Sequence, residues 1–256
     1  MSSYEKAGSL GRGAQPPFPV GKVAQDWAHK RKISCHFFSS LPSTSRWVME
    51  QDFSIFSELS LVLTNEQTQG RGRTPERSWE SGAGAQNLTM NWVFPLGENP
   101  ARPPLPARMG LALYLAAVES FPRLTWSLKA PNDLWLNQKK VAGLLLEAVQ
   151  RGRQNWLSLG LGLNVFFSPP HVPSTHLRQW TEVTPELFES FLEILLRHWQ
   201  RALSTTEKNL PGLLSPLERE SLLQALKKST PHQDLLEVSP QADLKFPNQI
   251  QSWQDL

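Results

Sequence analysis

The pattern of apolar and polar residues along the chain predicts alternating strands and helices. Apolar runs of strand length occur at residues 33–38, 59–63 and 88–94. The last run alternates apolar and polar residues, as a half-buried strand does. Between residues 109 and 121 apolar residues recur at helical spacing and predict one amphipathic helix.

Capping signals predict where two further helices begin. Ser43 and Thr44 are good N-caps for a short helix through residues 47–49. Thr184 is a second N-cap, and Pro185 suits the first helical position. The apolar residues that follow would share one helix face. They are Leu187, Phe188, Phe191, Leu195 and Trp199.

Strand-like runs also follow one another closely in the middle of the chain. They cover residues 124–128, 134–136, 141–149 and 156–165, with short polar turns between them. Short turns imply antiparallel pairing. We therefore expect an α+β fold, with a mixed, mostly antiparallel β-sheet packed against helices.

Composition divides the chain into three parts. Residues 1–32 begin with a stretch rich in Gly, Ser and Pro and predict a flexible or extended arm. Residues 33–204 hold the strands and helices of the main domain. Residues 205–256 predict a partly helical tail, with a helix near 216–228 and no series of short alternating strands.

Charge and cysteine content limit the functional classes. The net charge of +3 suits an anionic ligand, but it is too mild to indicate nucleic-acid binding. The single cysteine, Cys35, cannot form an internal disulfide, so we expect a cytoplasmic protein. We expect no membrane span, because no run of 18 apolar residues is present, and no metal site, because Cys and His lack ligand spacing.

The loop at residues 67–79 carries the strongest chemical signal. Gly70 and Gly72 allow tight turns and close approach to a ligand. Guanidinium groups offer planar, multi-donor contacts to phosphate and carboxylate. The loop holds three of them, on Arg71, Arg73 and Arg77. The pattern predicts an anion-binding loop, with a solvated basic loop and a nucleic-acid contact as alternatives.

A second signal is the segment from Lys129 to Asp133, which follows a predicted strand. Pro131 keeps the chain extended. Lys129 would end the strand at the edge of the sheet, where a cation can meet a ligand; the alternative is a plain turn with an exposed lysine. Gly143 and Gly160 stand inside apolar strands, which suggests that another chain segment or a ligand packs closely there.

In this order the elements resemble the catalytic domain of biotin–protein ligases. The family pattern runs Ser-Thr-Asn, Gln-x-x-Gly-Arg-Gly-Arg with Arg-x-Trp, Lys-Trp-Pro-Asn-Asp, Lys-x-x-Gly-(Ile/Leu)-Leu-x-Glu and Gly-x-Gly-x-Asn. The resemblance covers roughly residues 33–170. The matching residues are Ser43-Thr44-Ser45, Gln67 with Gly70–Arg73, Arg77 and Trp79, Lys129–Asp133, Lys140–Glu147 and Gly160–Asn164.

The resemblance implies a class II aminoacyl-tRNA synthetase-like catalytic domain and a two-step reaction. Biotin would react with ATP, accompanied by Mg²⁺, to give biotinyl-5'-AMP. The biotin would then pass to a lysine of a biotin carboxyl carrier protein, of acetyl-CoA carboxylase or a related carboxylase. Residues before 33 lack a helix-turn-helix pattern, so we expect no DNA-binding function. The resemblance leaves a homodimer open.

The same resemblance assigns roles to individual residues. Ser43, Thr44 and Gln67 would bond the ureido ring of biotin, and Arg71 would line the same pocket. The catalytic residues would be Arg73 and Lys129, facing the biotin carboxylate and the α-phosphate of ATP. Further substrate-binding residues would be Ser45, Gly70, Gly72, Arg77, Trp79, Asn132, Gly143, Gly160 and Asn164.

Three features depart from the family pattern. Ser45 stands where Asn is usual, and Ala130 stands where Trp is usual. The SH3-like C-terminal domain is not recognisable after residue 204. A lipoate–protein ligase and a non-catalytic homologue that binds biotin or nucleotide are the alternatives. The Gly-Arg-Gly-Arg loop followed by Trp79 favours biotin over lipoate.

Overall fold

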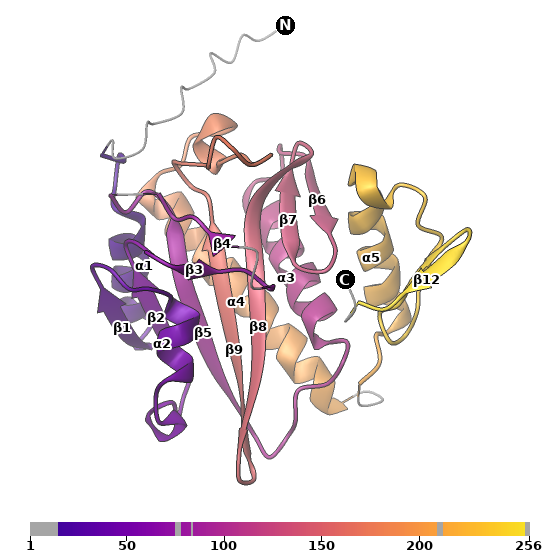
Figure 1. Ribbon diagram of the computed structural model, residues 1–256, viewed down its shortest axis with the longest axis horizontal. Coiled ribbons are helices and arrows are strands. Elements are labelled where there is room, and N and C mark those ends of the chain that lie inside the picture. Colours follow the sequence, from indigo (N-terminus) through magenta and orange to yellow (C-terminus); the bar gives the residue numbers. More distant parts are fainter. Residues whose placement is uncertain (1–14, 75–77, 83, 209–211, 254–256) are drawn as a thin grey trace, which may run out of the picture. The chain divides into compact units, whose positions relative to one another are not determined.

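The computed structural model describes residues 15–74, 78–82, 84–208 and 212–253 (Figure 1). The chain divides into two compact units. The first unit comprises Met1–Pro100 and Val141–Glu189, and the second comprises Ala101–Lys140 and Ser190–Leu256. Within the described part of the chain, no helix is long and apolar enough to cross a membrane.

The first unit is built on a mixed sheet with the strand order β1-β2-β5-β9-β8. β1 and β2 are parallel, whereas β5, β9 and β8 are joined by antiparallel pairing. Figure 1 shows the long strands β5, β9 and β8 side by side. The predicted α+β class is thereby confirmed. The strands span Ser34–Phe38 (β1), Ser60–Thr64 (β2), Leu88–Gly97 (β5), Gln154–Leu163 (β9) and Lys139–Arg151 (β8).

One face of this sheet is apolar. The strand register aligns Leu61, Trp92, Leu159 and Leu146 in a single row across four strands. Helix α1 (Val20–Lys30) covers this face, and the Trp27 and Trp92 rings lie 5.7 Å apart. Aromatic pairs at this separation add to the stabilisation that comes from burial alone.

The opposite face is polar and rich in glycine at one end, and we call it the polar face. Because direct cross-strand neighbours share a face, the register places three rows on it. The rows are Thr64–Thr89–Gly162–Gly143, Val62–Asn91–Gly160–Leu145 and Ser60–Val93–Ser158–Glu147.

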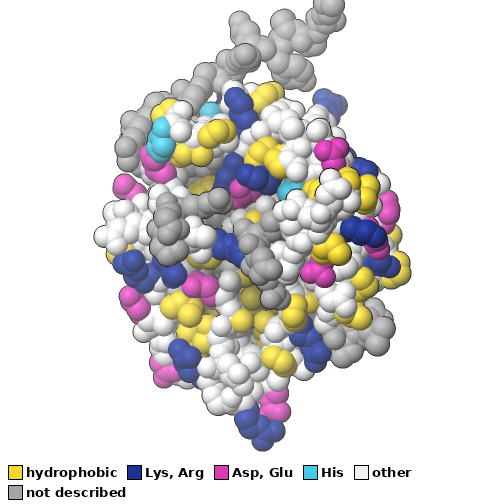
Figure 2. Space-filling view, turned by 45° about the vertical axis from the view of Figure 1, so that its right-hand side comes forward, with side chains coloured by type: hydrophobic (Ala, Val, Ile, Leu, Met, Phe, Trp, Pro, Cys, Tyr) yellow, Lys and Arg dark blue, Asp and Glu magenta, His cyan; other side chains and the backbone are white. Residues whose placement is uncertain are grey.

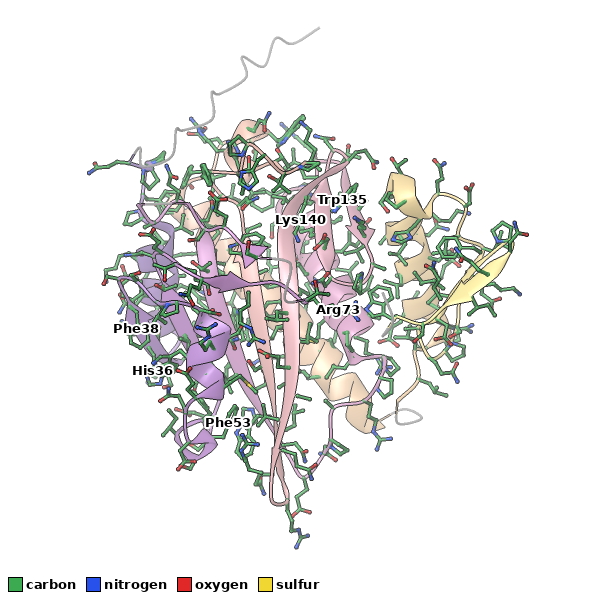
Figure 3. All side chains as sticks on the ribbon, viewed as in Figure 1. His36, Phe38, Phe53, Arg73, Trp135 and Lys140 are labelled. Atoms are coloured by element: carbon green, nitrogen blue, oxygen red, sulfur yellow. The ribbon has the colours of Figure 1, made fainter. Side chains whose placement is uncertain are left out.

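Helix α2 (Thr44–Met49) and the 3-10 helix η1 (Phe53–Ile55) cover the other end of the polar face. Trp47 of α2 packs with its ring centroid 5.2 Å from both His36 and Phe38 of β1, two residues labelled with Phe53 in Figure 3. An apolar cluster lies beneath the helices and leaves only the polar end of the face for chemistry. It consists of Val48, Phe53, Phe56, Val62, Val93, Val149 and Trp156.

The second unit combines helices with a β-hairpin and a three-stranded sheet. β6 (Trp126–Lys129) and β7 (Asp133–Leu136) form an antiparallel hairpin that contacts α3 (Leu105–Ser120). Helix α5 (Pro216–Lys227) packs on α3 and on β6. The 3-10 helix η3 (Thr230–His232) and a sheet of β10 (Glu237–Val238), β11 (Leu244–Phe246) and β12 (Gln249–Gln251) complete the second unit. Helix α4 (Pro185–Lys208) begins in the first unit and continues in the second, whereas η2 (Leu177–Gln179) belongs to the first.

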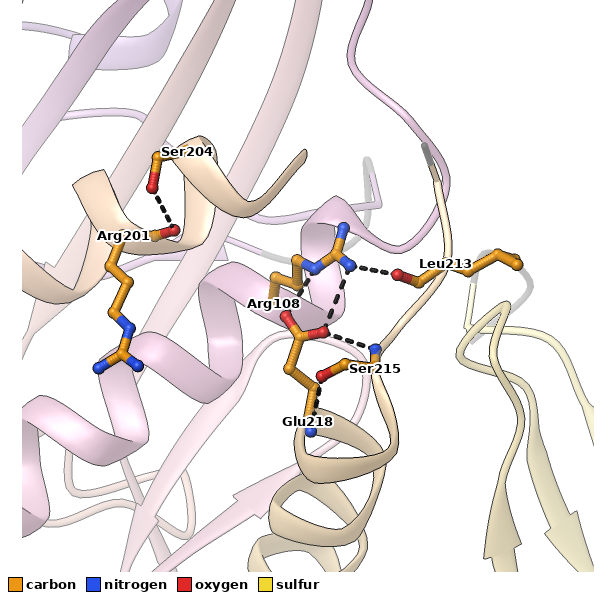
Figure 4. Close-up of polar contacts among 6 residues, drawn as sticks. All are labelled: Arg108, Arg201, Ser204, Leu213, Ser215 and Glu218. Atoms are coloured by element: carbon orange, nitrogen blue, oxygen red, sulfur yellow. Dashed lines mark hydrogen bonds and ion pairs between the residues drawn. The ribbon is translucent and has the colours of Figure 1, made fainter. Parts of the chain in front are cut away.

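A buried ion pair fastens α3 to the start of α5 (Figure 4). Arg108 is only 3% exposed, and its Nε lies 2.7 Å from Glu218 Oε1. Arg108 Nη2 also donates to the carbonyl oxygen of Leu213. Glu218 in turn closes a capping box with Ser215, because Glu218 N donates to Ser215 Oγ (3.2 Å) and Ser215 N donates to Glu218 Oε2 (2.7 Å).

The structure corrects three local predictions. The expected arm at residues 1–32 contains helix α1, whose buried residues include Val20, Ala24 and Trp27. The tail contains the strands β10, β11 and β12, each too short to show an alternating pattern. Strand β5 is not half-buried, since all residues from Leu88 to Phe94 are buried between coverings on both faces. The N-cap of α2 at Ser43 and the start of α4 at Pro185 are confirmed.

Candidate active site

Gln67 and the start of α2 form a fixed polar corner beside the polar face. Thr44 N and Thr44 Oγ1 both donate to Gln67 Oε1, at 2.8 and 3.0 Å. Gln67 N donates to Ser81 Oγ at 3.0 Å, and Ser43 Oγ accepts a bond from Arg46 N at 3.4 Å. With its oxygen used twice, Gln67 offers ligands the two hydrogens of its Nε2.

Two short strands, β3 (Gly70–Arg71) and β4 (Ser78–Trp79), form an antiparallel ladder beside this corner. Gly70 pairs with Trp79, and a Cβ on Gly70 would lie 2.2 Å from the Trp79 carbonyl oxygen and 2.9 Å from Gln67 Nε2. Only glycine fits there without displacing backbone atoms.

The glycines of β9 are explained by what packs against them. A Cβ on Gly162 would lie 2.3 Å from the indole ring of Trp79, so the ring lies directly on the strand. Gly143 is the cross-strand partner of Gly162 on β8. The sequence allowed either a ligand or a chain segment against Gly160 and the rest of this strand. At Gly162 the close neighbour is a chain segment.

A chain of buried polar side chains runs below Gly160. Ser158 Oγ donates to Asn91 Oδ1 at 3.1 Å, and Asn91 Nδ2 donates to Ser45 Oγ at 3.1 Å. Ser45 Oγ lies 2.9 Å from where a Cβ on Gly160 would stand. Ser45 is therefore held in one orientation at the edge of the polar face. Asn91 and Ser158 were not selected from the sequence. The signal that could have found them is a polar residue at alternate positions of two strands that face the same side of the sheet.

Asn164 is a hydrogen-bonding centre at the end of β9. Asn87 Nδ2 donates to Asn164 Oδ1 at 3.3 Å, and Asn164 Nδ2 donates to the Thr175 carbonyl oxygen at 3.0 Å. Asn87 Oδ1 also accepts from Val165 N at 3.0 Å. These bonds use both ends of the Asn164 amide within the fold, and its predicted contact with substrate stays a prediction.

Arg71 of the arginine-rich loop forms an ion pair with the sheet. Arg71 Nη1 lies 3.3 Å from Glu147 Oε1, with 42% of the Arg71 side chain and 20% of the Glu147 side chain exposed. Burial raises the pKa of Glu147, and the nearby Arg71 opposes that rise. Arg73, labelled in Figure 3, is exposed. The predicted phosphate contact Arg77 lies outside the described residues.

Lys129 belongs to the second unit, at the end of β6. Its Nζ stands 5.0 Å from the centroid of the Trp135 ring, a cation–π arrangement. Asp133, the strand partner of Lys129, lies 2.7 Å from Lys140 Nζ through its Oδ1. Trp135 and Lys140 are labelled in Figure 3. Although Ala130 replaces the usual tryptophan, an indole from β7 therefore accompanies this lysine.

The predicted site residues fall into two groups. Lys129 and Asn132 lie in the second unit, and the others of the described part lie in the first. Side-chain contacts or strand pairing join several residues of the first group around the polar face. They are Thr44, Ser45, Gln67, Gly70, Trp79, Gly143, Gly160 and their neighbours.

The described residues show no metal cluster, and the face drawn in Figure 2 shows no broad basic surface. Within the described ranges, no three His, Cys, Asp or Glu side chains are grouped so as to hold a metal ion. On the face drawn in Figure 2, Lys and Arg side chains are interspersed with Asp and Glu. This face does not offer the continuous basic stripe that is typical of nucleic-acid binding.

Comparison with known proteins agrees with this fold. The model of the Biotin/lipoate A/B protein ligase family matches residues 37–164, which is half of the chain. The chain therefore belongs to this family.

Individual relatives are biotin ligases. The chain is 34% identical over 156 residues to the biotin–[acetyl-CoA-carboxylase] ligase of Paracoccus denitrificans, covering 56% of this chain and 64% of that protein. It is 28% identical over 180 residues to biotin–protein ligase 2 of Arabidopsis thaliana, covering 62% and 54%. The chain thus spans roughly half the length of these curated relatives.

Solved structures share the fold. The biotin protein ligase from Aquifex aeolicus, in complex with biotin and ATP, aligns with a TM-score of 0.65 at 21% identity over 85% of this chain and 94% of that one. The biotin acetyl coenzyme A carboxylase synthetase from Helicobacter pylori aligns with a TM-score of 0.56 at 21% identity, over 86% and 99%.

Proposed function

We propose that this protein is a biotin–protein ligase. It activates biotin with ATP to biotinyl-5'-AMP and transfers the biotin to a lysine of a carboxylase's biotin carboxyl carrier protein. The observation that carries the proposal is Gln67, held by two bonds from Thr44 beside the polar face, where Ser45 and Trp79 pack closely against Gly160 and Gly162. The relatives in Arabidopsis thaliana and Paracoccus denitrificans, both named biotin ligases, support the same reaction.

The polar corner suits the ureido ring of biotin. A ureido group has one strong carbonyl acceptor and two N–H donors, so it needs both donors and acceptors within reach. Gln67 Nε2 supplies donors, the Thr44 hydroxyl, whose proton goes to Gln67, can accept, and the Ser43 hydroxyl, which accepts from Arg46 N, can donate. The Trp79 ring, packed on Gly162, offers an apolar surface for the sulfur-containing ring.

The activation step brings two anions together. A biotin carboxylate oxygen attacks the α-phosphorus of ATP, and the bond to pyrophosphate breaks. Two like charges about 4 Å apart repel by about 4 kcal/mol even at an effective dielectric constant near 20. Arg73 and Lys129 supply the positive charge that offsets this repulsion. Mg²⁺ would enter with the ATP and neutralise phosphate charge.

The transfer step needs little from the protein beyond positioning. The ε-amine of the acceptor lysine attacks the acyl carbon of the adenylate, AMP leaves, and the amine loses a proton. Positioning and charge stabilisation account for most of the acceleration in such reactions. We place the reaction in the cytoplasm, where the single Cys35 would stay reduced.

The test is to incubate the full chain with Mg-ATP, a biotin carrier domain, and either biotin or lipoate. We expect the intact mass of the carrier to rise by one biotinyl group, with release of AMP, and to stay unchanged with lipoate. Lys129→Ala should abolish AMP formation. Absence of biotin-dependent AMP release would refute the proposal, and a lipoyl adduct would assign the chain to the other branch of its family.

A further inference from the structure

A histidine from the C-terminal tail bonds the backbone of the Lys129 segment. Ala130 N donates to His232 Nε2 at 3.1 Å, across 102 positions of sequence. Both residues are buried, Ala130 with 7% and His232 with 6% of its surface exposed. A buried backbone N–H without a partner is costly, so this bond fixes the peptide group that follows Lys129.

The bond also fixes the protonation state of His232. Since Nε2 accepts, the ring proton must lie on Nδ1 and the imidazole must be neutral. Burial, and secondarily the charge of Lys129, lowers the pKa of His232 to about 4, in agreement with a neutral ring. A protonated ring would present a donor to the Ala130 N–H and place a second cation near Lys129.

Ala130 carries the backbone donor through which His232 anchors this short segment. Pro131 has no N–H, so between Lys129 and Asn132 only Ala130 can donate from the backbone. Trp135 holds the side chain of Lys129 by its ring face, 5.0 Å from Nζ. The lysine is thus held through its side chain by β7 and through its backbone by the tail.

The tail is itself fastened where it carries His232. Gln138, in the turn between β7 and β8, accepts from Thr230 N and Thr230 Oγ1, both at 3.0 Å. Gln138 Nε2 donates to the Lys228 carbonyl oxygen at 2.7 Å. The Phe246 ring of β11 lies 6.1 Å from the His232 ring. The bonds at the start of the 3-10 helix η3, together with the Phe246 ring beside the imidazole, therefore limit how far the imidazole can move.

We propose that His232 is a positioning residue that holds Lys129 in the orientation needed for adenylate formation. The tail, which has no recognisable SH3-like pattern, thereby contributes to the active site. This inference rests on the proposed function, because it assumes that Lys129 acts on the reacting groups.

The test combines two replacements with a matched control. In His232→Gln the Oε1 atom can take the place of Nε2 as an acceptor, whereas His232→Ala has no acceptor. We expect His232→Ala to lower kcat for biotin-dependent AMP formation about tenfold to a hundredfold, the range for small misplacements of catalytic groups. The KM for biotin should stay within about twofold, because the ureido corner is unchanged, and His232→Gln should recover most of kcat.

The control is His198→Ala, which removes a histidine of the same unit that bonds Glu119 at 2.9 Å. It should keep the wild-type kcat. Equal losses in His232→Ala and His232→Gln, or wild-type kcat in both, would overturn the inference. Wild-type protein that forms no AMP at all would refute the proposed function instead.

Nitrogen NMR of the wild-type protein provides a readout that needs no activity or variant. At pH 7 the His232 ring should be neutral with its proton on Nδ1. A charged ring, or a proton on Nε2, would overturn the inference whatever the kinetics show.

Discussion

The sharpest structural prediction concerns Gly162. In Gly162→Ala the added Cβ would lie 2.3 to 2.6 Å from three atoms of the Trp79 indole. Carbon atoms prefer separations of about 3.5–4.0 Å, so the ring would have to move by about 1 Å or more. Overpacking of this kind costs about 1–3 kcal/mol.

The displacement should reach the ligand site. Trp79 pairs with Gly70, and Gly70 stands next to Gln67 Nε2. We expect Gly162→Ala to weaken biotin binding about tenfold, since 1.4 kcal/mol corresponds to that factor. Urea unfolding measures the stability loss, and calorimetric titration with biotin measures the affinity.

The control is the same chemical change where space is open. A Cβ on Gly110, within α3, would meet nothing within 4 Å, so Gly110→Ala should stabilise the helix by up to about 1 kcal/mol and leave biotin affinity unchanged. In a Trp79→Ala background, Gly162→Ala should lower the free energy of unfolding much less than in the wild type. The double-mutant cycle should therefore give a coupling energy between the two positions of at least about 1 kcal/mol. Wild-type stability and affinity in Gly162→Ala would refute the packing argument.

Three further predictions concern ion pairs. Arg108→Met should lower the free energy of unfolding by about 3–5 kcal/mol, because it leaves Glu218 half-buried without its cation; a loss below about 1 kcal/mol in urea unfolding would count against this. Burial raises the pKa of Glu218, but bonds from Arg108 and the α5 cap outweigh this effect and hold the pKa below its ordinary 4.5. The difference in the free energy of unfolding between wild type and Arg108→Met should therefore be full above pH 4.5 and shrink as the pH falls below that value. A difference that stays constant from pH 7 to about 3 would contradict the assignment. Arg71→Met should raise the pKa of Glu147 further, because burial already raises it and Arg71 opposes the rise; carbon NMR titration of Glu147 checks this, and an unchanged or lower pKa would disprove the contact.

Much of the fold was predictable because local signals agreed with the final structure. The N-cap at Ser43 and the Thr184–Pro185 start of α4 depend on neighbours in sequence, as does the β7–β8 turn at residues 137–138. Helix α1 was also within reach, because Val20, Ala24 and Trp27 follow helical spacing. The Gly- and Pro-rich stretch before it obscured that pattern.

The parts that could not be predicted depend on distant contacts. Strand β5 is buried on both faces because α1 covers one face and α2 covers part of the other. Asn91 and Ser158 therefore form a buried hydrogen-bonded chain with Ser45 instead of meeting water. No local pattern distinguishes such a residue from an exposed polar residue of a half-buried strand.

The candidate site shows the same division. Sequence motifs were sufficient to select Gln67, Arg71 and Lys129, but they did not reveal the partners that orient them. Glu147 lay inside a recognised motif without an assigned role, although it pairs with Arg71. His232 lies in a tail with no recognisable motif, and only the folded chain places it against Ala130.

Biotin-dependent exchange of pyrophosphate into ATP tests the central claim most directly, because it reports adenylate formation without a carrier protein. We expect exchange by the wild-type chain with biotin and none with lipoate. Lys129→Ala should lower the exchange rate at least about a hundredfold, since it removes a charge that faces the transition state, while biotin binding alone stays within a few-fold. No biotin-dependent exchange by the wild type, or undiminished exchange by Lys129→Ala, would contradict the account.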